Sequence, residues 1–450
     1  MHTTYSGSTH KTLAILVGGG PAPGINGVIR SVTIEGINSG YRVLGIYDGF
    51  RWLAQGDSTR TRQLSIDDVS RIHFDGGSIL RTSRVNPVSS PEQLDATVRA
   101  LTEMGVDHLV TIGGDDTATS AMHIDRGAAQ ISVAHVPKTI DNDLPLPGHM
   151  PTFGYETARH VGVGITKAML VDSETTTRWY YLVSMGRKAG HLALGIGKAA
   201  GATLTLIGEE FRNETISFET ICDILEAAAI KRLAMGRAYG VAVLAEGLAA
   251  RIDPEELKAR ATVERDAHGN VRFSEIELGR IVKNEVRSRL RERGIDMTIV
   301  DKDIGYELRC ASPIPFDLEY TQDLGYAAVQ FLLSGRSGAI VTIDRGRLIP
   351  MPFRTVLDES TGKAMIREVD IDSDSYKVAL HYMIRLNESD FADPKNVARL
   401  ALIGKLTAEE FEARFRYLCD DPPVRASAKP DVPPGEDERK AAPARKTARG

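Results

Sequence analysis

Short apolar runs alternate with amphipathic stretches along most of the chain. Each run is a few residues long, is rich in β-branched and other aliphatic residues, and is followed closely by glycine, proline or charged residues, which is typical of a buried strand. Such runs lie at Leu13–Val17, Tyr41–Tyr47, His108–Ile112, Ile131–Val136, Trp179–Val183, Thr203–Ile207, Val241–Leu244 and Ala339–Ile343. Stretches between them, such as Val28–Ser39 and Pro91–Met104, repeat their apolar residues at helical spacing. Strands that alternate with helices predict an α/β fold with doubly wound, parallel-rich sheets.

The pattern divides into two α/β regions, and the length of 450 residues allows two or three domains. We expect two Rossmann-like domains. The first covers residues 1–150 and is completed by part of 307–360, whereas the second covers 151–306 and is completed by part of 360–419. Residues 420–450 are rich in proline, alanine and charged residues and hold few large apolar ones, so we expect a disordered tail.

Two segments in the second half of the chain predict longer helices. Ile276–Arg293 is basic and amphipathic, and we expect its charges to form a solvated face rather than a nucleic-acid site. Leu400–Leu418 has helical spacing, and we expect it to form one last helix.

Composition narrows the classes of protein. The net charge of −5 gives no overall field that favours nucleic acid or an anionic membrane. No apolar run approaches the roughly 20 residues that span a bilayer. The three cysteines, Cys222, Cys310 and Cys419, have no CxxC spacing, which fits a reducing compartment. We therefore expect a cytoplasmic protein with neither nucleic acid nor membrane as a partner.

Polar clusters follow two of the predicted strands. Gly113–Thr117 reads GGDDT and Pro137–Asp143 reads PKTIDND. In open α/β sheets, ligands bind beyond the carboxyl ends of the strands, so these clusters are placed to form a site. Asp, Asn and Thr also cap helices and fill turns. Two such clusters on neighbouring strands favour the ligand site over capping alone.

Glycine-rich and arginine-bearing loops follow other strands. Gly18–Gly27 joins the first strand to a helix, and such a turn lets the backbone approach an anion. It has neither the GxGxxG spacing nor a Walker lysine, and tight packing alone would also explain it. Gly76–Arg84 could hold a phosphate through Arg84, or could be a surface loop with solvated arginines. Ser184–His191 carries Arg187 beyond a further strand.

Taken together, these motifs resemble the phosphofructokinase family, and specifically its pyrophosphate-dependent branch. GGGPAPGIN, GGDDT, PKTIDND, MGRKAGH, AEG and GYELR occur in the family's order and spacing over about residues 11–415. Members that use ATP typically have glycine at the positions of Asp116 and Lys138 in this chain. The two substitutions therefore favour pyrophosphate as the phosphoryl donor.

The resemblance implies an Mg²⁺-dependent phosphotransferase of glycolysis and gluconeogenesis. It would transfer a phosphoryl group reversibly from diphosphate to the 1-hydroxyl of fructose 6-phosphate, and sedoheptulose 7-phosphate shares the reacting end. The first domain would bind the donor and Mg²⁺, and the second would bind the sugar phosphate. An ATP-dependent 6-phosphofructokinase is the nearest alternative. A catalytically silent sugar-phosphate sensor is opposed by the retained acids and Arg187, and a dinucleotide-binding oxidoreductase by the missing GxGxxG.

Individual roles follow from the chemistry and the resemblance together. Asp115 is the candidate Mg²⁺ ligand. Lys138 would stabilise charge on the transferring group, Asp141 would accept the proton of the sugar hydroxyl, and Asp116 would disfavour ATP. Gly20 and Arg84 would hold the donor phosphates. The sugar-phosphate site would comprise Thr139, Ile140, Asp141, Arg178, Met185, Gly186, Arg187, Glu246, Tyr306 and Arg309.

One residue of this set implies a homo-oligomer, either a dimer or a tetramer. Arg178 lies seven positions before Met185, the family's spacing for an arginine that reaches into a neighbouring subunit's site. The family also leads us to expect a basic residue about six positions before Tyr306. Val300 stands there, and Lys302 is the candidate replacement. Tyr306 itself stands where bacterial ATP-dependent members have histidine.

Overall fold

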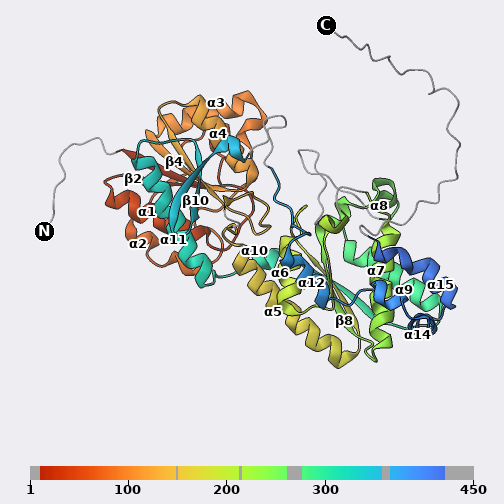
Figure 1. Ribbon diagram of the computed structural model, residues 1–450. Coiled ribbons are helices and arrows are strands. Elements are labelled where there is room, and N and C mark those ends of the chain that lie inside the picture. The colour runs from red at the N-terminus through yellow and green to blue at the C-terminus, as the bar shows by residue number, and fades with distance from the viewer. Residues whose placement is uncertain (1–10, 148–149, 212–214, 261–275, 357–364, 421–450) are drawn as a thin grey trace, which may run out of the picture.

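The computed structural model describes residues 11–147, 150–211, 215–260, 276–356 and 365–420. Figure 1 shows the chain as two α/β units, one on a seven-stranded sheet and one on a four-stranded sheet. The prediction of an α/β fold with doubly wound, mostly parallel sheets is confirmed.

The first unit has the strand order β11-β10-β5-β4-β1-β2-β3. The strands from β10 to β2 in that order are parallel, and only the edge strands β3 and β11 are antiparallel. Their bounds are β1 (Thr12–Val17), β2 (Arg42–Ile46), β3 (Thr61–Gln63), β4 (Val106–Gly113), β5 (Ser132–Pro137), β10 (Ala339–Asp344) and β11 (Arg347–Pro352).

Helices cover both faces of this sheet because its strands are apolar on both sides. The helices are α1 (Ile25–Asn38), α2 (Ile66–Val69), α3 (Pro91–Glu103), α4 (Asp115–Gly127) and α11 (Pro315–Leu333). α1 and α11 pack together over one face, where Ile15 and Val110 are buried, while α3 and α4 cover the other face over Leu16 and Leu109. Figure 1 shows the late, cyan elements α11 and β10 beside the red N-terminal ones.

The second unit has four parallel strands in the order β7-β8-β6-β9. Their bounds are β6 (Trp179–Ser184), β7 (Leu204–Leu206), β8 (Gly240–Ala245) and β9 (Ile299–Ile304). Alternate residues of β6 point into two different cores. Trp179 and Tyr181 pack with α7 (Phe218–Ala234) and α9 (Leu278–Glu292), whereas Leu182 packs with α5 (Tyr155–Thr176), α6 (His191–Ala200) and α12 (Asp374–Tyr382).

The remaining helices are short: α8 (Pro254–Arg260), α10 (Tyr306–Arg309), α13 (Glu388–Phe391), α14 (Pro394–Gly404) and α15 (Ala408–Phe415). The prediction of one helix over Leu400–Leu418 is wrong. Lys405 ends α14 in the left-handed conformation (φ 56°), and Thr407 starts α15 with a capping box that includes Glu410. The apolar residues continue at helical spacing across this boundary, but the two caps end one helix and start the next.

The solvated charged face predicted for Ile276–Arg293 is only partly correct. Most charges of α9 are exposed, but Arg289 is buried and pairs with acids of α7. Among the described residues, no helix combines the length and the apolar character that crossing a membrane requires. Apart from Asp420, the segment predicted as a tail lies outside the described residues.

Candidate active site

The registers of the two sheets place the predicted motifs in two compact groups. In the first sheet Val17 aligns with Ile112 and Ile112 with Val136, so the residues after these positions leave three neighbouring strands at one level. In the second sheet Ser184 aligns with both Ala245 and Ile304. Parallel pairing thus collects loops that are far apart in sequence at one edge of each sheet.

The glycine-rich turn after β1 lies against cations from both units. The backbone N–H of Gly18 donates to the carbonyl of Ile112 (2.8 Å) and fixes the turn beside β4. Lys138 Nζ donates to the carbonyl of Gly20. A Cβ added at Gly20 would lie 3.6 Å from the guanidinium carbon of Arg309. The turn therefore offers backbone groups next to two positive charges, as phosphate binding requires.

Glycine is required in this turn for packing as well. A Cβ at either Gly18 or Gly113 would collide with the side chain of Thr117, which is buried in α4. Gly19 has φ +81°, which side chains rarely adopt. Tight packing and anion approach are thus compatible explanations of the same glycines.

Asp115 and Asp116 lie in the first turn of α4, where a negative charge interacts favourably with the helix dipole. Asp115 lies 3.4 Å from the guanidinium of Arg187, which comes from the other unit. This ion pair spans the two groups of motifs. Asp115 is the largest cause that raises the pKa of Arg187. Asp116 is exposed beside it.

The loop after β5 carries the candidate base. Asp141 is buried, and its N–H donates to Thr139 Oγ1 (3.0 Å). Its Oδ1 has no hydrogen-bond partner among the described residues. Burial and the negative charge of Glu246 raise the pKa of Asp141 against the opposing arginines and Lys138. A buried carboxylate with a spare oxygen and a raised pKa is suited to accept a proton.

Lys138 and Asp143 complete the charges of this loop. Lys138 is buried, its N–H donates to the carbonyl of Gly113 (2.8 Å), and burial lowers its pKa to about 8. Burial and the charges of Asp141 and Asp115 raise the pKa of Asp143. Asp143 has no role among the predicted site residues, although its place in TIDND is a usable signal.

Glu246 organises the turn of the second unit. Its Oε1 accepts N–H bonds from both Gly186 (3.0 Å) and Arg187. Arg187 is held in the left-handed conformation (φ 53°), and its side chain extends toward Asp115. Burial raises the pKa of Glu246. Met185 packs against Gly305, where an added Cβ would lie 2.9 Å from the methionine methyl.

Ile140, Tyr306, Arg309 and Arg84, which were also predicted, lie around these two groups. Ile140 is buried in a core that also contains Met185 and Leu308. The guanidinium of Arg309 lies over the ring of Tyr306, which is largely exposed, at 5.1 Å from its centroid. Arg84 is exposed and directly follows Ser83, whose carbonyl accepts from Gly19.

Two predicted residues lie away from this chain's own site. Arg178 precedes β6, so six strand residues separate it from Met185 at the other end. Its Nε is buried without a hydrogen-bond partner among the described residues. Lys302 is exposed on the edge strand β9, while Val300 is partly buried against the core.

Arg367 lies beside the site, although nothing in the sequence marks it as a site residue. It lies well beyond the last predicted strand, Ala339–Ile343, and belongs to none of the six motifs. Its guanidinium donates to the carbonyl of Asn142 (3.0 Å), to Asn142 Oδ1 and to the carbonyl of Met150 (3.0 Å). No sequence signal links positions 142 and 367.

The donor set suits a cation that is shared with a substrate. Within the described ranges, no cluster of three or more histidine, cysteine or acidic residues could form a metal cage. Mg²⁺ is usually held by one or two carboxylates together with water and substrate phosphates. Asp115, about one-third exposed, fits that kind of ligand.

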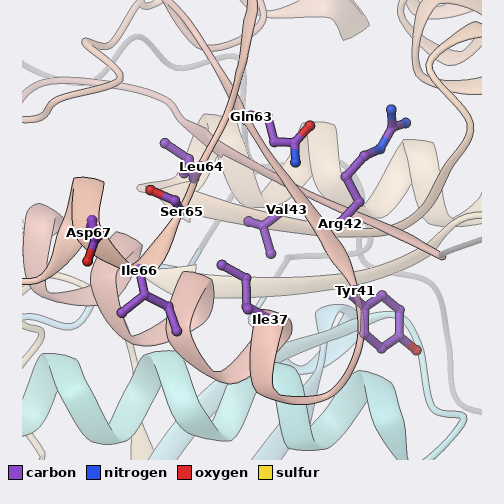
Figure 2. A pocket seen from close by; sticks show the side chains of 9 residues that line it. All are labelled: Ile37, Tyr41, Arg42, Val43, Gln63, Leu64, Ser65, Ile66 and Asp67. Atoms are coloured by element: carbon purple, nitrogen blue, oxygen red, sulfur yellow. The ribbon is translucent and has the colours of Figure 1, made fainter. Parts of the chain in front are cut away.

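The surface hollow in Figure 2 lies outside this site. It encloses about 380 Å³ between Ile37 of α1, the start of β2 at Tyr41–Val43, and Gln63–Asp67. The start of β2 is the opposite end of the sheet from the glycine-rich turn. The hollow therefore plays no part in the arrangement described above.

Similarity to solved structures supports the fold. A structure titled pyrophosphate-dependent phosphofructokinase, from Nitrosospira multiformis, superimposes with a TM-score of 0.65. The match covers 83% of this chain and 91% of that chain at 16% identity. At that identity the likeness concerns the fold alone.

Sequence comparisons give the family. Residues 12–332 match the family described as phosphofructokinase. The pyrophosphate–fructose 6-phosphate 1-phosphotransferase of Thermotoga maritima is 53% identical over 418 residues, which cover 92% of this chain and 100% of that protein. A protein of the same name from Naegleria fowleri is 49% identical over 417 residues, which cover 90% of this chain and 95% of that protein. With this match over most of its length, the chain belongs to the phosphofructokinase family.

Proposed function

We propose that this protein is a pyrophosphate-dependent 6-phosphofructokinase of glycolysis and gluconeogenesis. It transfers a phosphoryl group reversibly from diphosphate to the 1-hydroxyl of fructose 6-phosphate. The observation that carries the proposal is the position of Lys138 and Asp141, which are buried on one loop and face the arginines of the other unit. The two relatives that cover nearly the whole chain bear the corresponding name.

The seven-stranded unit binds the donor. Gly20, Lys138 and Arg84 surround the diphosphate, and Lys138 stabilises the charge that spreads over the transferring group and the leaving phosphate. Asp115 would hold Mg²⁺, which would supply further neutralisation of the phosphate oxygens. Diphosphate and the product phosphoester have similar energies, so the reaction runs in either direction.

The four-stranded unit binds fructose 6-phosphate. Met185, Gly186, Arg187 and Glu246 bind the sugar and orient its 1-hydroxyl toward the donor, with Thr139, Ile140, Tyr306 and Arg309 around it. Asp141 accepts the hydroxyl proton as the new P–O bond forms. Its raised pKa favours that transfer, because a base that is too acidic would hold the proton weakly.

Asp116 and Lys138 set the donor choice in different ways. Asp116 is an exposed carboxylate beside the donor site, where it repels the α-phosphate of ATP. Diphosphate has no α-phosphate and escapes that repulsion. Lys138 supplies a positive charge that the glycine typical of ATP-dependent members at this position cannot supply.

The test is kcat/KM for diphosphate and ATP in the wild type, Asp116→Gly, Lys138→Gly and the double mutant. Asp116→Gly should gain ATP activity, Lys138→Gly should lose diphosphate turnover, and the double mutant should favour ATP most. Parallel arms without donor and with NAD(P)⁺ separate the sensor and oxidoreductase alternatives. A wild type that prefers ATP would contradict the donor assignment.

We also propose a cytoplasmic homo-oligomer in which Arg178 completes a neighbouring subunit's sugar-phosphate site. Its distance from its own chain's site supports this role. Arg178→Ala should raise KM for fructose 6-phosphate, because it removes a charge-assisted hydrogen bond of roughly 1.5–3 kcal/mol. A monomer in analytical ultracentrifugation that is fully active at the same concentration would refute the shared site.

A further inference from the structure

A short segment, Arg367–Val369, joins the two loops that carry the candidate base and the sugar-binding arginine. We call these three residues the strap. On one side the N–H of Arg367 donates to the carbonyl of Asp143 at 2.7 Å, and the guanidinium makes the bonds to Asn142 and Met150 described above. Asn142, Asp143 and Met150 all follow Asp141 in the loop after β5.

The bonds from Arg367 hold Asn142 in a backbone conformation that is unfavourable for most residues. Asn142 has φ +58°, a left-handed conformation that is uncommon for residues other than glycine. Its side-chain Oδ1 accepts from both Arg367 and the N–H of Thr152 (3.1 Å), and its carbonyl accepts from Arg367 Nε (3.0 Å). Because Asn142 directly follows Asp141, the bonds that fix Asn142 also fix the direction of the Asp141 side chain.

On its other side the strap is bound to the turn that follows β6. One oxygen of the buried Glu209 accepts N–H bonds from Gly190 (2.7 Å) and Val369 (3.1 Å). The carbonyl of Arg367 can only accept a hydrogen bond, so His191 Nε2 donates to it at 3.1 Å. Gly190 ends the turn that carries Arg187, and His191 begins α6 directly after it, so the strap ties the sugar-binding turn to the Asp141 loop.

We propose that Arg367 is a positioning residue that sets the place of Asp141 relative to the sugar phosphate. The inference rests on the proposed phosphotransferase function and extends it to a residue outside the family motifs. Arginine suits the role because its rigid planar fork can reach three acceptors at once. Lysine has one flexible ammonium group and cannot reproduce that geometry.

The first test is Arg367→Ala, assayed in both reaction directions. A displacement of the base by about 1 Å costs on the order of 10²-fold in rate, so kcat should fall by about that factor. KM for diphosphate should change little, because the strap does not contact the donor loop at Gly18–Gly20. Added guanidinium at a non-denaturing concentration should restore part of kcat, whereas methylammonium at equal ionic strength should not.

Two more variants separate positioning from folding. Arg367→Lys keeps the positive charge and much of the stem, so we expect a wild-type melting temperature together with a low kcat. Glu368→Gln is the matched control on the same strap, because its half-exposed carboxylate pairs with the partly buried Arg251 at 3.4 Å and makes none of the hydrogen bonds described above. It should retain wild-type kcat and KM.

The outcomes are distinct. Wild-type kcat in folded Arg367→Lys, or a loss in Arg367→Ala that guanidinium does not restore, would overturn the positioning role while leaving the proposed function intact. A wild-type enzyme that is inactive with both diphosphate and ATP would overturn the proposed function and the positioning role together.

Discussion

Two regions of this protein bury several charges each, and they treat those charges differently. Between the sheets, Asp141 and Asp143 lie near Lys138 and Arg187, and one oxygen of Asp141 has no partner within the described ranges. Between α7, α9 and the C-terminal helices, the fully buried Glu226 and its neighbour Asp223 are surrounded by arginines. In the first region a carboxylate oxygen is left without a hydrogen-bond partner from the described residues. In the second region the carboxylates are paired with arginines of the protein itself.

The second region, which we call the arginine–carboxylate cluster, consists of Asp223, Glu226, Arg289, Arg293 and Arg414. Glu226 accepts from Arg293 and from Arg414 (2.8 Å), and Asp223 accepts from Arg289 (2.8 Å) and from the hydroxyl of Tyr417 (2.7 Å). A buried charge is tolerated when its partners and hydrogen bonds compensate the lost hydration. The cluster thereby attaches α15 to the core of the second unit.

The difference indicates which group of charges serves stability and which serves chemistry. Burial, together with like charges, raises the pKa of both Asp141 and Asp143 at the candidate site, which is unfavourable for the folded state at neutral pH. Sites that bind substrates often give up stability in this way. We expect substitutions in the two regions to separate activity from stability.

The largest expected effect is on the rate of Asp141→Asn. The amide cannot accept the hydroxyl proton, so kcat should fall by about 10²–10⁴-fold while KM changes little. The melting temperature should not fall, because the substitution removes a buried charge with an unpartnered oxygen. Steady-state kinetics and calorimetry on the same preparation test both parts, and an unchanged kcat in folded protein would refute the assignment of the base.

Glu226→Gln should show the opposite pattern. It removes the charge that pairs with Arg289, Arg293 and Arg414, and breaking a buried ion network of this kind costs roughly 3–5 kcal/mol of unfolding free energy. kcat should stay at the wild-type value. Glu285→Gln is the control, since that partly exposed partner of Arg289 should contribute only about 0–1 kcal/mol. Equal denaturation midpoints for the two variants would contradict the importance of the cluster.

The pH dependence at the candidate site sharpens the comparison further. The lowered pKa of Lys138, about 8, means that the ammonium is charged below that pH and neutral above it. kcat/KM for diphosphate should therefore fall as pH rises through about 8, since this parameter reports the free enzyme. Lys138→Arg keeps its charge throughout, so any remaining activity of that variant should show no such decline. A decline that persists in Lys138→Arg would assign it to another group.

The smallest effect is expected from truncation after Asp420. This cut leaves Arg414 and Tyr417 in place, so unfolding free energy should change by no more than about 0.5 kcal/mol and kcat should be unchanged. Truncation after Lys405 is the contrast, because it removes those contacts and the buried Phe411 and Phe415. If truncation after Asp420 also lowered the melting temperature, residues 421–450 would contribute to stability.

Sequence reasoning worked best where the signal is local. The apolar runs located β1, β4, β5 and β6 to within a residue or two, because burial on both faces of a parallel strand requires continuous aliphatic residues. The clusters at the strand ends followed from the same pattern. The boundary between α14 and α15 was missed because both helices carry apolar residues at matching spacing, and the break depends on one left-handed residue, Lys405.

By itself, the sequence determined the α/β class, the edges at which the motifs meet and the family to which they belong. Only the tertiary structure decided that Arg289 is buried rather than solvated, and that Arg367 contacts Asn142 across 225 positions of sequence. The physical reason is that hydrophobic periodicity reports the environment along one strand or helix. The partner of a charge is set by how distant elements pack, because burial makes an unpaired charge costly wherever its partner lies in the chain.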